Sequence, residues 1–154
     1  MSGCHGLTRF NTAGISRVSK NKQLGTLYEQ KFVLECLERG LHPFHPVEDG
    51  LLQDFIVMNR DGTMFRVQVK GTNGTIQKNP KTTRRYKVIA GYGQSSKERI
   101  DCEFIDILAA YAEPIDTWYI IPCEEITGLS VWMSPGSDKN RYEKFHESWS
   151  IFVN

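Results

Sequence analysis

Hydrophobic and polar positions follow a helical period in the first third of the chain. Over residues 26–40 the apolar side chains recur as they do on an amphipathic helix, and Gly40 ends the pattern as a helix C-cap does. Charged and apolar residues fall on opposite predicted sides: Lys31, Glu35, Glu38 and Arg39 against Leu27, Val33, Leu34, Cys36 and Leu37. The pattern predicts one helix that packs its apolar side on a core.

Glu29 does not fit this helix, because it projects onto the predicted apolar side. Two interpretations remain open. In the first, Thr26 and Glu29 form a capping box that satisfies the free amides of the first helical turn. In the second, Glu29 faces inward because it serves a site beside the helix.

Residues 54–70 predict a β-hairpin. Its first run is apolar on both faces, which is typical of a central strand covered on both sides. Its second run alternates between apolar and polar positions, and Asp61-Gly62 supplies the turn between the two runs. The alternation places two sets on opposite faces: Phe65, Val67 and Val69 on one, and Arg66, Gln68 and Lys70 on the other.

The remaining segments are less regular. Two His-Pro steps in residues 42–50 predict extended backbone, where His42 and His45 are possible metal ligands but a surface role is favoured. Residues 71–85 lose the apolar pattern and predict a long flexible loop of functional importance. Three apolar runs predict strands over residues 104–111, 118–121 and 129–133, although the first also fits a helix. A short closing helix is expected over residues 142–149.

Composition indicates an ordinary globular chain. The 154 residues are 40% hydrophobic and 24% charged, with a formal net charge of +1. Such a chain forms one domain with a real core, here residues 24–154. Residues 1–23 predict a basic arm that carries Arg9, Arg17, Lys20 and Lys22. A nucleic-acid partner cannot be inferred from the net charge and needs a local basic patch.

Four cysteines stand far apart, with no C-x-x-C pair: Cys4, Cys36, Cys102 and Cys123. This spacing argues against a zinc ribbon and against a disulfide framework, so reduced intracellular thiols are expected. The start of the chain has no basic region followed by an apolar stretch, and no segment reaches the length of a membrane helix. A cytoplasmic location is therefore expected.

The polar residues of the hairpin predict a metal-dependent hydrolase site. Asp54 opens the first strand, and Gln68 and Lys70 share one face of the second. A carboxylate, a side-chain oxygen and the carbonyl of Val69 form a set of hard oxygen ligands suited to Mg²⁺. An ammonium group beside that metal stabilises the charge that develops as water attacks a phosphodiester.

A helical Glu29, then Asp54 on a strand, then Gln68-x-Lys70 resembles the PD-(D/E)XK nuclease superfamily over roughly residues 24–122. Within it, the pattern is most similar to archaeal-type Holliday junction resolvases and to the cyanobacterial group I intron homing endonuclease. The resemblance implies an α/β (α+β) fold, with a restriction-endonuclease-like αβββαβ core and a central mixed sheet flanked by helices.

The resemblance also implies roles for these residues. Asp54 is the central metal ligand, Gln68 takes the place of the usual second acid, and the Val69 carbonyl completes the set for Mg²⁺, with Mn²⁺ as a substitute. Lys70 positions or activates the water, and Glu29 holds a second metal or a metal-bound water. The chain departs from the motif at two positions, because Gln53 replaces the proline and Gln68 replaces an acid. The second departure removes a negative charge and favours the homing type.

The basic segment after Lys70 is suitably placed for DNA. Its lysines and arginines are expected to neutralise phosphates or read guanine, and its amides to read adenine. The candidate DNA-binding residues are Arg66, Thr72, Gln77, Lys78, Asn79, Lys81, Arg84, Arg85 and Lys87. The basic arm is expected to add phosphate or minor-groove contacts. Cutting both strands needs two sites, so a homodimer or homotetramer is expected.

Three other functions remain open. A junction resolvase uses the same chemistry but reads DNA shape. A DNA-binding module with an inactive site would explain Gln68 and would bind without cutting. A plain α/β domain unrelated to nucleic acid is the fourth interpretation.

Overall fold

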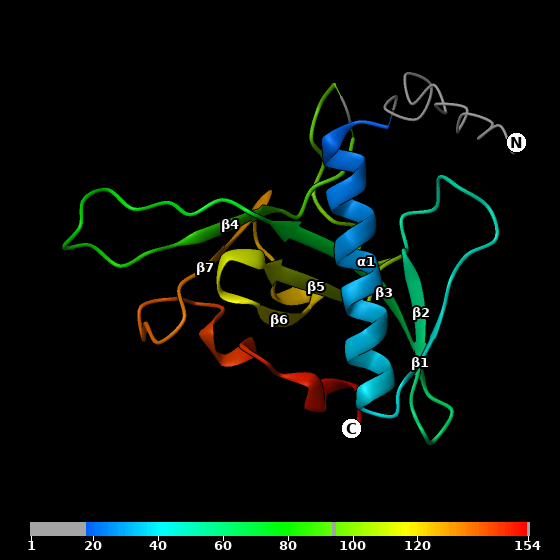
Figure 1. Cartoon of the computed structure of the whole chain (residues 1–154). Coiled ribbons are helices and arrows are strands. Elements are labelled where there is room, and N and C mark those ends of the chain that lie inside the picture. The colour runs from blue at the N-terminus through cyan, green and yellow to red at the C-terminus, as the bar shows by residue number, and fades with distance from the viewer. Residues whose placement is uncertain (1–17, 94, 154) are drawn as a thin grey trace, which may run out of the picture.

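A five-stranded mixed sheet with one long helix across it forms the centre of the molecule (Figure 1). The computed structural model describes residues 18–93 and 95–153. The sheet has the order β1-β2-β3-β5-β6, and β4 pairs with β7 in a separate two-stranded sheet. The elements are α1 (Lys20–Glu38), β1 (His42–Phe44), β2 (Phe55–Met58), β3 (Met64–Thr72), β4 (Tyr86–Ile89), β5 (Ile107–Ala112), β6 (Thr117–Pro122) and β7 (Ser130–Met133).

Helix α1 begins earlier than the sequence pattern predicts. Ser19 is its N-cap, and the Ser19 hydroxyl accepts a hydrogen bond of 3.3 Å from the Lys22 amide. The last residues of the predicted arm 1–23 are thus helical, while residues 1–17 lie outside the described residues. The predicted helix end is confirmed. Gly40 has φ +70°, and the Leu41 amide returns to the Cys36 carbonyl, as in a Schellman motif.

The buried side of α1 differs from the predicted one. Tyr28, Phe32 and Cys36 are buried, whereas the predicted core leucines of this helix are exposed. Aromatic packing explains the difference, because the Phe32 ring lies within 6.5 Å of four other aromatic rings: Phe55, Trp118, Trp149 and Phe152. The helix therefore turns its aromatic side, and not its leucines, towards the sheet.

Two hydrophobic cores lie on opposite faces of the large sheet. One contains the buried side of α1 together with Val67 and Val69, and the other lies under the β4–β7 sheet. Strand β5 is buried at every position because both of its faces are covered. Double coverage had been predicted for β2, which instead alternates between buried and half-buried positions.

The predicted hairpin is confirmed. Strands β2 and β3 pair antiparallel with Phe55 opposite Val67, and Gly62 adopts φ +83° in the turn. The Asn59 side chain accepts hydrogen bonds from the backbone amides of Asp61 and Thr63, so it holds the turn from inside.

Residues 73–85 are more regular than the predicted flexible loop. They form a projecting hairpin in which Ile76 and Arg85 exchange backbone hydrogen bonds of 2.8 Å (Figure 1). From here on this hairpin, and not the predicted N-terminal segment 1–23, is called the arm. The arm leads into β4, a strand that was not predicted.

The later strands are largely as predicted. Strand β5 starts at Ile107 and not at residue 104, because residues 102–104 form a turn. The predicted closing helix over 142–149 is wrong, since this part of the chain forms two short 3₁₀ turns, Glu143–Phe145 and Trp149–Phe152. The mixed sheet and its covering helix confirm the predicted fold class. Among residues 18–93 and 95–153 no second α-helix occurs, and the β4–β7 sheet covers the other face.

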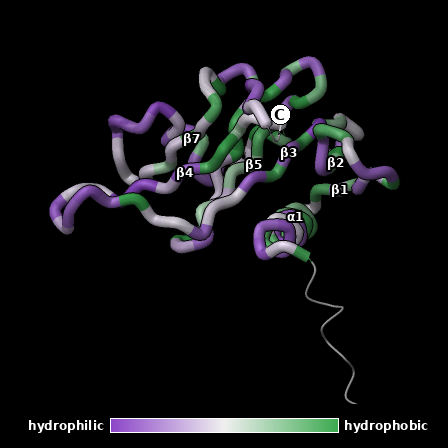
Figure 2. Tube along the Cα trace, turned by 90° about the horizontal axis from the view of Figure 1, so that it is seen from above, coloured by the Kyte–Doolittle hydropathy of each residue, from purple (hydrophilic) through white to green (hydrophobic). Residues whose placement is uncertain are grey.

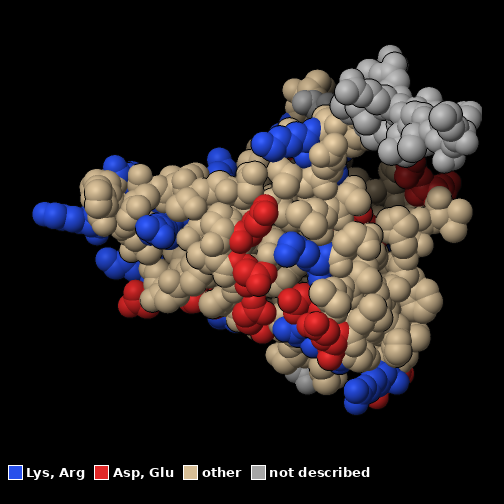
Figure 3. Space-filling model, viewed as in Figure 1, with Lys and Arg blue, Asp and Glu red and all other residues tan. Residues whose placement is uncertain are grey.

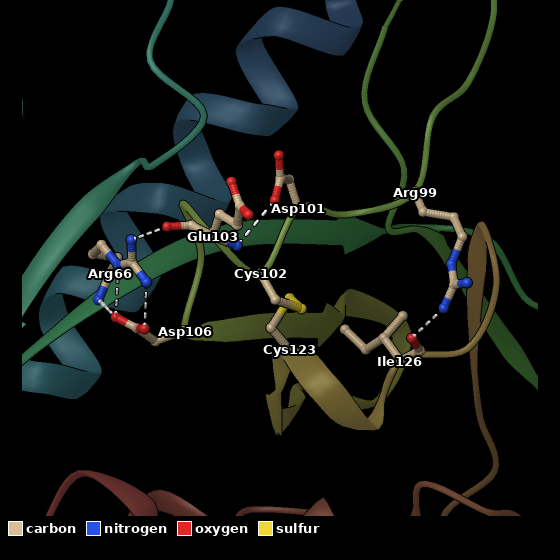
Figure 4. The surroundings of a disulfide bond; sticks show 8 residues. All are labelled: Arg66, Arg99, Asp101, Cys102, Glu103, Asp106, Cys123 and Ile126. Atoms are coloured by element: carbon tan, nitrogen blue, oxygen red, sulfur yellow. Dashed lines mark hydrogen bonds and ion pairs between the residues drawn. A yellow bond between two sulfur atoms is a disulfide. The ribbon is translucent and has the colours of Figure 1, made fainter.

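A disulfide joins Cys102 to Cys123, which corrects the expectation of reduced thiols for this pair (Figure 4). Strands β5 and β6 run antiparallel, so the segment before β5 meets the end of β6, and the two Cα atoms lie 5.6 Å apart. Cys36 is buried and free. In the described part of the chain, no helix is long and apolar enough to cross a membrane.

Candidate active site

Asp54 lies at the beginning of β2, where the strand meets β3. Its backbone amide donates to the Val67 carbonyl at 2.9 Å, and its carboxylate accepts a hydrogen bond of 2.7 Å from the Val69 amide. The Asp54 carboxylate thus accepts from the Val69 amide in place of a backbone carbonyl, where the β2–β3 ladder would otherwise continue. This contact fixes the Asp54 carboxylate against the end of β3 that carries Lys70.

Gln68 and Lys70 lie on the face of β3 opposite Val67 and Val69, as the alternation predicts. Lys70 and Asp54 line one cavity of about 330 Å³. Gln68 is 6% exposed, and its amide nitrogen donates to the Leu52 carbonyl at 3.2 Å. Gln68 is therefore packed beneath the site and does not line that cavity.

Glu29 reaches the same cavity from α1. The capping-box interpretation is wrong, because the helix begins at Lys20 with Ser19 as its N-cap. Thr26 lies inside the helix, where its hydroxyl donates to the Lys22 carbonyl at 3.1 Å. Glu29 faces inward because its side chain lines the cavity together with Asp54 and Lys70.

The pKa values of both carboxylates are raised in the folded protein. Burial raises the pKa of Asp54, while the Val69 amide, Lys70 and His45 act to lower it. Burial and the nearby Asp54 charge raise the pKa of Glu29, and His45 and Lys70 lower it in part. Holding both groups ionised thus costs free energy, and a bound cation would offset that cost.

The oxygen atoms present fit a hard divalent cation. The Val69 carbonyl points to the same side of β3 as its amide, and the β2–β3 ladder ends at the Phe55–Val67 pair, so no rung of that ladder covers this carbonyl. Asp54 and Glu29 add carboxylate oxygens at the same cavity. No cluster of three Cys, His, Asp or Glu side chains suited to a metal occurs among the described residues. This agrees with an amide at position 68 in place of an acid.

The sequence pattern missed two contributors to the site. Gly71 follows Lys70, and a Cβ atom there would come within 2.2 Å of the Tyr28 ring, so only glycine lets α1 approach β3 this closely. His45, expected at the surface, is indeed exposed, but it lines a neighbouring cavity of about 550 Å³ that shares Glu29 and Asp54. The glycine directly after Lys70 was the available signal for the close approach of α1. The His-Pro step at His45 did not indicate on which side of the chain the imidazole lies.

Eight of the nine candidate DNA-binding residues fall into three groups, and the ninth, Lys87, lies on β4. Thr72 lines the cavity itself. Those of the arm are exposed, with the single exception of the half-buried Arg85, and the arm projects well beyond the sheet (Figures 1 and 3): Gln77, Lys78, Asn79, Lys81, Arg84 and Arg85. Arg66 stands apart, because its guanidinium pairs with Asp106 at 2.8 Å beside the disulfide (Figure 4).

Two of the arm's amide side chains also shape its turn. The Gln77 side chain donates to the Thr82 carbonyl at 2.7 Å, and the Asn79 side chain accepts from the Lys81 amide at 3.0 Å. At the base of the arm, the Arg85 guanidinium and the Lys87 ammonium lie 4.7 and 5.3 Å from the centre of the Trp132 ring. The arm is thus a shaped element that carries basic groups along its length.

Comparison with known proteins gives a family and a fold for the chain. Residues 19–149 match the sequence model of a family described as PD-(D/E)XK endonuclease. One similar solved structure is that of a bacterial homing endonuclease, I-Ssp6803I, with a TM-score of 0.70 and 17% sequence identity, over 88% of this chain and 94% of that chain. At this identity the likeness shows a common fold. A search of curated protein sequences finds no match.

Proposed function

Because the chain belongs to the PD-(D/E)XK endonuclease family, we propose that it is a metal-dependent endodeoxyribonuclease that cuts duplex DNA at a specific site, as a homing-type enzyme does. The observation that carries the proposal is the meeting of Glu29, Asp54 and Lys70 in one cavity. They come from α1, from the start of β2 and from β3, so the fold and not the local sequence brings them together.

Each residue has a distinct role in phosphodiester hydrolysis. Asp54 and the Val69 carbonyl would hold a Mg²⁺ ion, for which Mn²⁺ can substitute, and Glu29 would hold a second ion or a metal-bound water. The metal, when bound, supplies charge stabilisation at the phosphate and lowers the pKa of bound water. Lys70 donates hydrogen bonds to the attacking water and to the phosphate oxygen that gains charge. Gln68 packs below and supports the strand.

The arm would provide sequence selection. Lys78, Lys81 and Arg84 are exposed along it, and the amide residues Gln77 and Asn79 lie on either side of Lys78 in the sequence. A two-stranded β-ribbon fits the major groove, where such side chains read base edges. Each phosphate contact that is removed should reduce the salt dependence of binding by about one unit of slope.

A cleavage assay tests the proposal. Wild-type protein, Asp54→Asn and Lys70→Ala are incubated with Mg²⁺ at low salt on a labelled four-way junction and on a pool of long linear duplexes. Asp138→Asn and Lys139→Ala change the same residue types at exposed positions outside the cavity and serve as matched controls. Discrete cuts in duplex that only the two cavity variants lose would agree with the proposal.

The other outcomes identify the alternatives. Cutting of the junction alone would make the protein a Holliday junction resolvase. Salt-sensitive binding without metal-dependent cutting would identify an inactive DNA-binding module. Full cleavage by Lys70→Ala would remove Lys70 from the mechanism.

A further inference from the structure

The outer side of α1 carries a stripe of exposed leucines. Leu27, Leu34 and Leu37 are 42%, 56% and 58% exposed, and they point away from the buried residues Tyr28, Phe32 and Cys36. The helix lies in front of the sheet, and no described element packs on its outer side (Figures 1 and 2). The stripe spans about 15 Å of helix axis at 1.5 Å per residue. Leucines exposed along one face of a helix indicate a contact surface.

The charges of α1 run against the helix dipole. Lys20 and Lys22 lie in its first turn, which holds no acid, and Glu38 ends the helix, whose last turn holds no base. A helix is stabilised by the opposite arrangement, with acids at its N-terminus and bases at its C-terminus. Among the described residues, neither Lys20 nor Glu38 has an ion-pair partner. Figure 3, which looks onto α1, shows basic groups at its upper end and both acidic and basic groups in its lower half.

We propose that α1 packs antiparallel against α1 of a second copy of this chain through the leucine stripe. In an antiparallel pair the basic end of each helix faces the acidic end of the other, so Lys20 of one copy approaches Glu38 of its partner. The acidic end of each helix then lies beside the N-terminus of the other, and the basic end beside the C-terminus, which is the arrangement that stabilises a helix dipole. The surface is self-complementary, as a two-fold homodimer requires. A second copy therefore fits both the apolar stripe and its charge pattern.

The same arrangement places the two active-site cavities on one side of the dimer. At 100° per residue, Lys20, Lys31 and Glu38 lie along one flank of the stripe, and Glu29 lies on the other. A two-fold axis perpendicular to both helices keeps each flank on its own side of the dimer. Both Glu29 cavities then open on one side, where a single duplex could meet them, and the charged flanks meet on the other. This step rests on the proposed nuclease function, whereas the dimer itself does not.

The mass of the full chain in solution tests the interface without DNA or metal. Light scattering after size-exclusion chromatography should give a dimer for the wild type. Leu34→Glu should raise the dimer dissociation constant by about 100-fold or more, because the symmetry repeats the buried charge in both copies. Met64→Glu, at a position 64% exposed on β3, should leave the dimer intact. Leu34 is exposed in the single chain, so circular dichroism should be unchanged for a monomeric, folded Leu34→Glu, and its melting temperature should no longer depend on protein concentration.

A charge exchange identifies the antiparallel geometry. Lys20→Glu and Glu38→Lys should each weaken the dimer by about tenfold, and the double variant should restore it, because each pair is then reversed in sign. Each single change favours the helix dipole, so neither should unfold α1.

Two outcomes would overturn the inference. A wild type that stays monomeric at about 100 µM, where a dimer with a micromolar dissociation constant would be largely formed, would mean that the stripe does not bind a second copy. A dimer that survives Leu34→Glu would mean that the copies meet elsewhere. Neither measurement uses DNA or metal, so the dimer and the nuclease chemistry are tested separately.

Discussion

The carboxylate of Asp54 accepts a 2.7 Å hydrogen bond from the backbone amide of Val69. The contact joins the start of β2 to the residue before Lys70, and it occupies one carboxylate oxygen while the other remains for a cation. It also fixes where the Val69 carbonyl emerges, because the amide and the carbonyl of one strand residue point to the same side. One hydrogen bond thus sets the relative positions of a proposed metal ligand, a second ligand and the lysine.

Asp54→Asn should stabilise the metal-free protein while abolishing cleavage. Burial raises the pKa of Asp54, so its contribution to stability is present below the unfolded-state pKa and is lost as the pH rises through the folded-state pKa. Above the folded-state pKa the carboxylate is ionised and the cost is complete, and an amide oxygen can still accept from Val69. Removing the charge also removes one cause of the raised pKa of Glu29.

Thermal melting in EDTA measures this effect. We expect a melting temperature about 2–4 °C higher for Asp54→Asn at pH 7, which corresponds to roughly 1 kcal/mol in a chain of this size. The difference should shrink towards pH 4. Asp138→Asn, at an exposed site, should change neither value, and an equal gain at both pH values would contradict the electrostatic origin.

Gly71→Ala should disturb the site from below. The added Cβ would lie 2.2 Å from Cδ2 of Tyr28, so α1 or the ring must move, at a cost of about 1–3 kcal/mol. Because Glu29 follows Tyr28 on α1, cleavage should fall as well. Urea unfolding measures the first effect. The control is Gly74→Ala, where the nearest atom, Oγ1 of Thr72, is 3.6 Å away. Stability of Gly71→Ala equal to that of the control would show that the helix has room to shift.

The sequence alone predicted the positions of residues that are fixed by their neighbours along the chain. Gln68 and Lys70 share a face because strand alternation requires it, and the Asp61-Gly62 turn fixes which strand lies beside them. The arm was found as a basic loop but not as a hairpin, because the bridge between Ile76 and Arg85 depends on the later pairing of β4.

Longer-range packing decided what local patterns left open. Helical period alone could not show which apolar side of the helix is buried, since Leu34 and Phe32 lie on opposite sides, and the fit of the Phe32 ring among other aromatic rings decided it. Cys102 and Cys123 could not be paired in advance, because their approach depends on the antiparallel pairing of β5 with β6. Glu29 was resolved only when the helix was seen to begin at Lys20.

The disulfide predicts a thiol count and a change in stability. Denatured but unreduced protein should show two reactive thiols fewer than reduced protein, which should show four. Cys102→Ser should lower stability by about 3 kcal/mol, because the bond closes a loop with a sequence separation of 21. Its melting temperature should then no longer respond to reductant. Four reactive thiols without reductant would show that the pair is not bonded.

Gln68→Glu tests why an amide occupies the place of an acid. The side chain is 6% exposed, and its nitrogen donates to the Leu52 carbonyl. A carboxylate has no proton to donate, so it would face that carbonyl as a second acceptor and add a third negative charge near Asp54 and Glu29. We expect a loss of about 1–3 kcal/mol in EDTA, the usual cost of an unsatisfied buried polar group.

Divalent metal should reverse part of that loss. A third carboxylate increases the charge available to a cation, so Mg²⁺ should raise the melting temperature of Gln68→Glu more than that of the wild type, with half of the effect at a lower concentration. Gln77→Glu, an exposed change on the arm, should show no such gain. If Mg²⁺ stabilises Gln68→Glu no more than the wild type, position 68 lies too far below the cavity to act on the metal, and Asp54, Glu29 and the Val69 carbonyl would then be the whole set of protein ligands.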